Sequence, residues 1–181
     1  AAAFATYFQV SCLDQSDRYI NLFEDLGLEI EGRFCDLECD RYPFEDNSFD
    51  VIYSKSVIEH LRDWEHYLSE IHRLLQGEGN LVIMTPSWEK QRDNFYDDPT
   101  HIHPFTHIGL KRALGIAGFK DVTVREFYQL PFVWRHQYIA WVPRLVALLP
   151  NCMKWKDAAR TQQRLLVRFS KETMLLAVAR K

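Results

Sequence analysis

Apolar positions along the chain fall into two patterns, short continuous or alternating runs and runs with helical spacing. The short runs predict strands at residues 8–13, 28–35, 49–54, 80–84, 121–128 and 173–179. Helical spacing predicts helices from Ser16 to Gly27, from about Asp63 to Gly77, and from Thr106 to Gly118. Strands and helices that alternate in this way are typical of an α/β protein with a doubly wound, mostly parallel sheet, in which the last strand forms an antiparallel edge.

Length and charge divide the chain into regions. Its 181 residues suffice for one domain. Residues 1–128 hold 12 Lys and Arg against 23 Asp and Glu, whereas residues 129–181 hold 10 against 2, so the overall net charge is -3. We therefore expect an α/β core at 1–128, a basic, aromatic helical insertion or lid at 129–172, and a final edge strand at 173–181. The acidic core argues against nucleic acid as the partner.

The basic region can be interpreted in two ways. Residues 130–149 are rich in aromatic and aliphatic side chains and contain Arg135 and Arg144 but no acidic residue. Apolar side chains beside one-sided positive charge are typical of a segment that contacts anionic lipid or a lipid-linked acceptor. A lid or packing helix with a solvated basic face explains the same pattern. No run of apolar residues is long enough to span a bilayer. The four unevenly spread cysteines favour a reducing, cytoplasmic setting. If the basic region contacts lipid, the protein is peripheral to the membrane.

Candidate binding residues follow the predicted strands, because ligands of open α/β sheets bind beyond the carboxyl ends of the strands. Asp14 follows the first strand, Asp36 the second, and Ser54-Lys55-Ser56 the third. An acidic side chain in the position of Asp14 can accept hydrogen bonds from a ribose. It can equally cap the following helix together with Ser16.

The residues from Phe34 to Pro86 resemble the middle of a class I S-adenosylmethionine-dependent methyltransferase of the type 11 kind. The likeness lies in an ordered set of motifs: Asp-Leu after a strand, Pro-Phe-x-Asp-x-Ser-Phe-Asp, Glu-His-Leu, a helix ending Arg-Leu-Leu, and a glycine turn before a strand ending Thr-Pro. With the segments on either side, the resemblance covers about residues 8 to 128. It implies a Rossmann-like methyltransferase fold with S-adenosylmethionine as cofactor.

The resemblance also implies roles for individual residues. Asp14 and the adjacent Gln15 would bind the cofactor's ribose, Asp36 and Leu37 would face its adenine, and Ser54, Lys55 and Ser56 would border its methionine end. One departure concerns the glycine-rich loop of the family, since residues 1–26 contain no glycine. We therefore expect the first strand and helix of the fold to be missing, with residues 1–7 as the end of that helix.

Three histidines are candidate catalytic residues. His101 and His103 lie in the polar loop after the strand at 80–84, where the resemblance places the substrate, and His60 follows the strand at 49–54. A histidine near neutrality can take a proton from a hydroxyl acceptor, although these side chains can equally stabilise the loop. Two sets of residues offer metal ligands: Asp97 or Asp98 with His101 and His103, and Cys35 with Cys39. Neither set is typical of a metal site, and we expect no metal.

The sequence thus predicts a methyltransferase that acts on a small or lipid-linked acceptor, with O-methylation favoured. A non-catalytic methyltransferase-like binding or scaffold domain is the alternative, and the missing glycine loop favours it. A nicotinamide-dependent dehydrogenase uses a similar ribose-binding acid, but residues 34–86 do not resemble that family.

Overall fold

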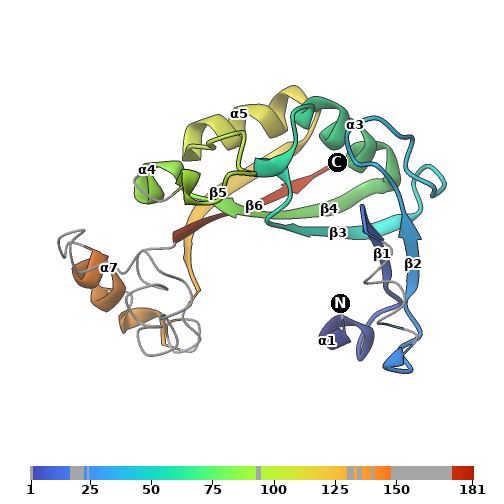
Figure 1. Cartoon of the computed structure of the whole chain (residues 1–181), viewed down its shortest axis with the longest axis horizontal. Helices are drawn as coiled ribbons and strands as arrows, with labels where there is room; N and C mark the ends of the chain where they lie inside the picture. Colours follow the sequence, from blue (N-terminus) through green and yellow to red (C-terminus); the bar gives the residue numbers. More distant parts are fainter. Residues whose placement is uncertain are drawn as a thin grey trace.

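The computed structural model describes residues 2–16, 23, 25–92, 95–129, 133, 136–139, 141–147 and 173–181. Its strands form two sheets, a two-stranded sheet of order β1-β2 and a four-stranded sheet of order β3-β4-β6-β5 (Figure 1). The strands are β1 (Ser11–Asp14), β2 (Glu31–Phe34), β3 (Phe49–Lys55), β4 (Leu75–Pro86), β5 (Lys120–Tyr128) and β6 (Thr173–Arg180). The six predicted strands are confirmed, with shifts of a few residues at their ends.

The four-stranded sheet is mixed. β3 pairs with β4 in parallel, while β6 is antiparallel both to β4 and to β5. The predicted antiparallel direction of the last strand is confirmed, but its predicted position at the edge is wrong, because β6 lies between β4 and β5. Residues 173–177 of β6 are all buried, as a strand flanked on both sides requires, whereas β5 exposes more than half of its residues and forms the edge.

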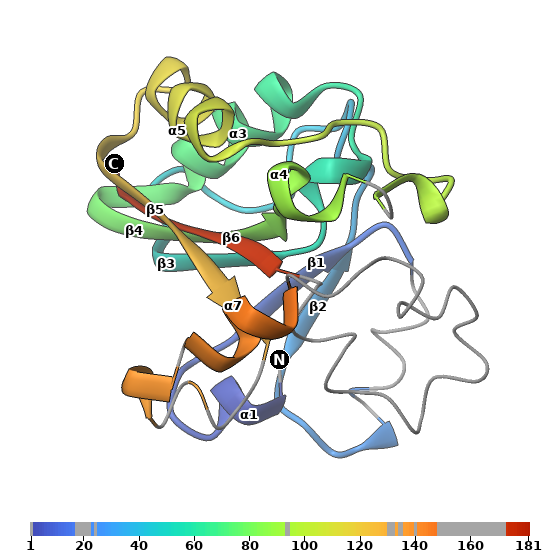
Figure 2. The same cartoon turned by 90° about the vertical axis from the view of Figure 1, so that its left-hand side faces the viewer.

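Two helices, α3 (Trp64–Leu74) and α5 (His107–Ile116), lie on one face of this sheet (Figures 1 and 2). Each begins where the sequence predicts, because the side chains of Asp63 and Thr106 accept hydrogen bonds from the first-turn N–H groups of His66 (2.8 Å) and Gly109 (2.9 Å). Their apolar faces pack on the sheet to form the main core. Its fully buried members include Leu68, Leu75, Leu81, Ile83, Leu110, Leu114 and Leu175.

The predicted glycine turn after α3 differs from the observed one. The helix ends at Leu74, and β4 already begins at Leu75. Pairing with β3 passes from Phe49↔Leu75 to Val51↔Asn80, so residues 76–79 form a bulge within the strand. A Cβ on Gly79 would lie 2.9 Å from the carbonyl oxygen of Gln76, and only glycine fits this bulge without a shift.

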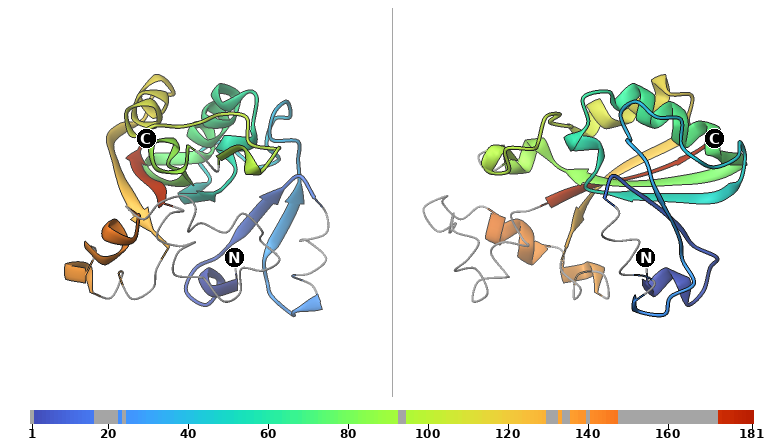
Figure 3. Two further views of the ribbon diagram at one scale, coloured as in Figure 1. Left: turned by 60° about the vertical axis from the view of Figure 1, so that its left-hand side comes forward. Right: turned by 45° about the vertical axis from the view of Figure 1, so that its right-hand side comes forward.

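The two-stranded sheet is separate from the main sheet, although the sequence predicts one continuous sheet. β1 and β2 pair in parallel, from Ser11↔Glu31 to Asp14↔Phe34, and both run steeply across the direction of β3 and β4 (Figures 1 and 3). The short helix α1 (Ala2–Ala5) precedes β1, in line with the predicted helix end. Most of the predicted helix between Ser16 and Gly27 lies outside the described residues.

The remaining elements are short. They are η1 (Ile58–His60), α4 (Trp88–Gln91), η2 (Phe95–Asp97), η3 (Gln137–Ile139) and α7 (Trp141–Ala147). η3 and α7 fall in the predicted insertion at 129–172, most of which lies outside the described residues. Within the part of the chain that the structure describes, no helix combines the length and the apolar character needed to cross a membrane.

Candidate active site

The residues after β1 and β2 meet at the carboxyl ends of these strands, as the sequence predicts. The Nε2 atom of Gln15 donates a hydrogen bond to Oδ1 of Asp36 at 3.3 Å. Because β1 and β2 are parallel neighbours, Asp14 ends one strand beside the end of the other. Two candidate cofactor-binding segments therefore lie side by side.

The two aspartates are held by local hydrogen bonds. Oδ1 of Asp14 accepts from the backbone N–H of Ser16 at 2.8 Å, which closes a local turn after β1. Oδ1 of Asp36 accepts from the backbone N–H of Glu38 at 2.9 Å, and this bond, followed by one with Cys39, lowers the pKa of the Asp36 carboxyl. Leu37 beside it is buried, and its carbonyl accepts from the Tyr42 hydroxyl at 2.9 Å.

The polar segment Ser54-Lys55-Ser56 lies at the end of β3, shortly before η1. Ser54 is buried, and its Oγ accepts a 2.5 Å hydrogen bond from the Tyr67 hydroxyl, while Lys55 is exposed. Ser56 has a φ of 53° and donates its N–H to the carbonyl of Met84 on β4 at 2.9 Å. A non-glycine residue in this left-handed conformation is uncommon and is found preferentially in turns and functional sites.

Glu59 is the most unusual polar residue of this region. Its side chain is completely buried, and Oε2 accepts a hydrogen bond from the Thr85 hydroxyl at 2.9 Å. Its other oxygen, Oε1, has no hydrogen-bond partner among the described residues. Burial raises the pKa of the Glu59 carboxyl, with Thr85 opposing the effect. A buried carboxyl with one unpartnered oxygen, in the short helix that follows β3, makes Glu59 a candidate functional residue.

Two of the three candidate histidines lie against this carboxyl. The ring centroids of His60 and His101 are 4.8 Å apart, and Nε2 of His60 lies 4.0 Å from Oε1 of Glu59. The loop reaches this position because the N–H groups of Ile102 and His103 donate to the carbonyl of Glu59, at 2.8 and 3.0 Å. Backbone hydrogen bonds thus join η1 to a loop segment that is distant in the sequence.

The third candidate, His103, is oriented differently. Its Nε2 atom lies 3.2 Å from the carbonyl oxygen of Arg62. The metal-ligand set considered from the sequence, Asp97 or Asp98 with His101 and His103, is not the set that the fold gathers. Ligand atoms of Glu59, His60 and His101 come together instead. Glu59 is not among the residues predicted from the sequence, although it stands beside His60 in the Glu-His-Leu motif.

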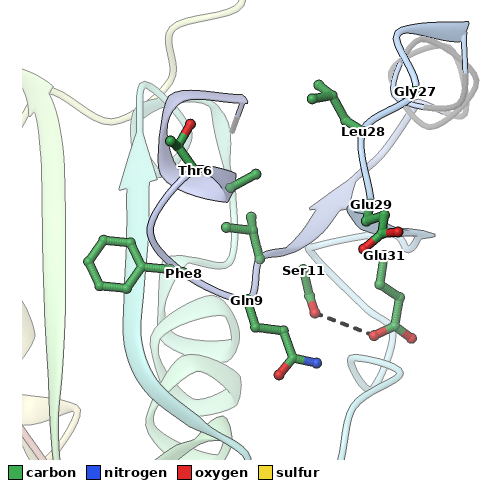
Figure 4. A pocket seen from close by; sticks show the side chains of 10 residues that line it. Thr6, Phe8, Gln9, Ser11, Gly27, Leu28, Glu29 and Glu31 are labelled. Carbon is green, nitrogen blue, oxygen red and sulfur yellow. Dashed lines mark hydrogen bonds between the residues drawn. The ribbon is translucent and has the colours of Figure 1, made fainter.

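A separate hollow of about 630 Å³ lies at the opposite, amino ends of β1 and β2 (Figure 4). Ser11 and Glu31 line it and share a 3.3 Å hydrogen bond. Residues 5–6, 8–10 and 27–29 complete the wall. It contains none of the predicted site residues. Because ligands of α/β sheets bind at carboxyl ends, we do not assign the cofactor to this hollow.

Comparison with known proteins identifies the fold. The model of a family described as a methyltransferase domain matches residues 1–83. A solved S-adenosylmethionine-dependent methyltransferase of Archaeoglobus fulgidus superposes with a TM-score of 0.58 at 18% identity, over 99% of this chain and 90% of that one. Residues 1–83 thus match a methyltransferase domain, and the chain shares the fold of that solved methyltransferase over nearly its whole length. The predicted resemblance, with its Rossmann-like fold, is thus confirmed.

The curated relatives that this chain matches are larger proteins. The sterol 4-C-methyltransferase strm-1 of Caenorhabditis elegans is 26% identical over 117 residues, 62% of this chain and 34% of the relative. The sarcosine/dimethylglycine N-methyltransferase of Aphanothece halophytica is 31% identical over 91 residues, 48% of this chain and 32% of the relative. The chain therefore spans about a third of the length of these relatives.

Proposed function

We propose that this chain transfers a methyl group from S-adenosylmethionine to a small or lipid-linked acceptor, and that the methylated atom is oxygen. The observation that carries the cofactor assignment is the contact between Gln15 and Asp36, which unites the residues after β1 and β2. There, Asp14 and Gln15 would hold the ribose, and Asp36 and Leu37 would face the adenine. Ser54, Lys55 and Ser56 would border the methionine end.

The proposed oxygen acceptor rests on the centre formed by Glu59, His60 and His101. A hydroxyl acceptor must lose its proton as the methyl group arrives, and this centre gathers three basic side chains. His103 stays a weaker candidate because its ring is engaged with Arg62. The relatives named above, by their names, methylate a sterol carbon and an amine nitrogen, so the acceptor assignment does not come from them.

The cofactor assignment predicts that Asp14→Ala weakens S-adenosylmethionine binding at least tenfold, because a ribose loses a charge-assisted hydrogen-bond acceptor. Calorimetry with S-adenosylmethionine and S-adenosylhomocysteine measures this directly. Asp50→Ala is the matched control, since Asp50 is an exposed aspartate near the amino end of β3. Absence of binding by the unaltered chain would favour the non-catalytic scaffold, because the glycine-rich loop of the methyltransferases has no counterpart in residues 1–26.

We further propose a cytoplasmic setting with peripheral contact between the basic tail and anionic lipid. The described cysteines Cys12, Cys35 and Cys39 are free thiols, as a reducing compartment favours. Large apolar side chains are exposed in and before α7, beside the basic Arg144: 76% of Tyr138, 58% of Trp141 and 55% of Leu145. Exposed aromatic and aliphatic side chains with positive charge suit a lipid interface.

The lipid proposal predicts co-sedimentation with phosphatidylserine vesicles but not with phosphatidylcholine vesicles, and release at high salt because the attraction is electrostatic. The double change Trp141→Ala and Leu145→Ala should weaken binding several-fold. Ile116→Ala serves as the control, because Ile116 is an exposed apolar residue on α5. Equal binding by the double variant and the unaltered chain would contradict the role of α7.

A further inference from the structure

The centre at the carboxyl ends of β3 and β4 consists of one carboxylate and two imidazoles. One ligand atom from each of Glu59, His60 and His101 lies within 4.8 Å of the other two. Glu59 and His60 belong to η1, and His101 follows η2. The N–H groups of Ile102 and His103 join the two segments through the carbonyl of Glu59. Glu59 is fully buried, while His60 and His101 are partly buried.

Hydrogen bonds around His60 determine which of its ring nitrogens carries a proton. The Thr100 hydroxyl donates to Oδ1 of Asp98 at 2.6 Å, because an ionised carboxylate can only accept. The Thr100 oxygen is then free to accept from Nδ1 of His60 at 2.9 Å. The carbonyl of Thr100, 3.3 Å from the same nitrogen, is a further acceptor. The proton of a neutral His60 ring thus lies on Nδ1, and Nε2 keeps a lone pair.

The same reasoning applies to His101. Its Nδ1 atom lies 2.6 Å from the carbonyl oxygen of Phe95, which can only accept a hydrogen bond. Nδ1 is therefore the donor, and Nε2 of a neutral ring keeps its lone pair. Hydrogen bonds from Nδ1–H to backbone or side-chain oxygen are the usual means by which proteins orient a metal-binding imidazole.

One ring nitrogen of each histidine lies within 4.8 Å of an oxygen of Glu59. Nε2 of His60 lies 4.0 Å from Oε1 of Glu59, and this oxygen has no hydrogen-bond partner among the described residues. The 4.0 Å separation of Oε1 and Nε2 of His60 is too long for a hydrogen bond, so one proton cannot bridge them. A fourth acceptor, Oδ2 of Asp98, lies 4.0 Å from Nε2 of His101. Converging acceptors around a buried carboxylate are electrostatically complementary to a cation.

We propose that Glu59, His60 and His101 bind one divalent transition-metal ion of the zinc or cobalt type. Imidazole nitrogen and carboxylate oxygen are ordinary ligands of these ions. With metal–ligand bonds of about 2.0 Å, tetrahedral ligands lie about 3.3 Å apart. The three ligand atoms now lie within 4.8 Å of one another, so rotations of the side chains must bring them closer to the ion. Three protein ligands leave a coordination position open, as in catalytic sites.

An acceptor hydroxyl whose oxygen occupied the open position would release its proton to solvent water more readily, and its oxygen would then take the methyl group. This use of the ion rests on the proposed methyl transfer, whereas the binding of the ion does not. The centre thereby departs from the sequence analysis, which expected no metal.

The test is a titration of the purified whole chain, stripped with a chelator, with Co²⁺ followed by visible absorption and with Zn²⁺ followed by calorimetry. We expect one equivalent to bind. His60→Ala and His101→Ala should each weaken binding by roughly 100-fold or more, and Thr100→Val, which removes the acceptor for Nδ1 of His60, by roughly 10-fold. His66→Ala is the control, because His66 lies on α3 and contacts the carbonyl of Asp40 instead.

Three outcomes would overturn the proposal: no binding by the unaltered chain, equal binding by His60→Ala with its circular dichroism unchanged, or a thiolate-to-cobalt charge-transfer band that assigns the ion to cysteine. S-adenosylmethionine binding, measured separately with chelator present, distinguishes failure of the metal proposal from failure of the proposed methyl transfer. A chain that binds S-adenosylmethionine but no metal would refute only the metal centre. One that binds metal but no cofactor would refute the methyltransferase proposal alone.

Discussion

Replacement of His101 by alanine is expected to slow methyl transfer by roughly 100-fold while leaving the affinity for S-adenosylmethionine unchanged. His101 belongs to the centre proposed to act on the acceptor, and its ring contacts His60 and Phe95 rather than the aspartates that follow β1 and β2. Formation of S-adenosylhomocysteine, with the best acceptor from a panel of hydroxyl compounds, measures the rate. Calorimetry measures the affinity.

His103→Ala is the discriminating partner of this variant. The ring of His103 lies two positions from His101 in the sequence but contacts the carbonyl of Arg62. We therefore expect His103→Ala to slow methyl transfer by less than about tenfold. An equal loss in both variants would indicate that the loop, rather than one imidazole, governs turnover. Thermal unfolding of each variant separates this effect from instability, because His101 also contacts the carbonyl of Phe95.

The elements of this fold were predictable because their signals are local. Asp63 and Thr106 cap α3 and α5 as expected, and continuous apolar runs became buried strands. Strand order was not predictable in the same way. β6 reads as a last strand, yet it pairs with both β4 and β5, and such pairing depends on contacts between distant segments. The separation of β1 and β2 from the main sheet has no local signal either.

The site shows the same division. Asp14 and Asp36 come from a general rule about strand ends, and Gln15 joins their segments as that rule implies. The contact between Glu59 and His101 follows no such rule. It depends on the loop's N–H groups bonding to the carbonyl of Glu59, and nothing in the sequence spacing specifies that pairing. The role of Glu59 could not be predicted from the sequence, because a glutamate beside a histidine is equally typical of the start of a helix.

Arg73→Ala should lower the free energy of unfolding by about 2–3 kcal/mol, because Arg73 joins α3 to the loop before β3. Its guanidinium donates to both carboxylate oxygens of Glu70, at 2.9 and 2.7 Å, and to the carbonyls of Tyr42 and Phe44, at 2.9 and 3.0 Å. Only 17% of the Arg73 side chain and 11% of the Glu70 side chain are exposed, so solvent replaces these bonds poorly. Urea unfolding measures the loss.

Arg41→Ala is the matched control, since Arg41 pairs with Asp46 while 73% of its side chain is exposed, and we expect a change within about 0.5 kcal/mol. The loss in Arg73→Ala should also depend on pH. Arg73 lowers the pKa of Glu70 below its ordinary value of 4.5, so this stabilisation is complete above that value and is lost as the pH falls through the lowered one. The difference between the two proteins should therefore shrink in acid, and a difference that stays constant from neutral to acidic pH would contradict the ion pair as its source.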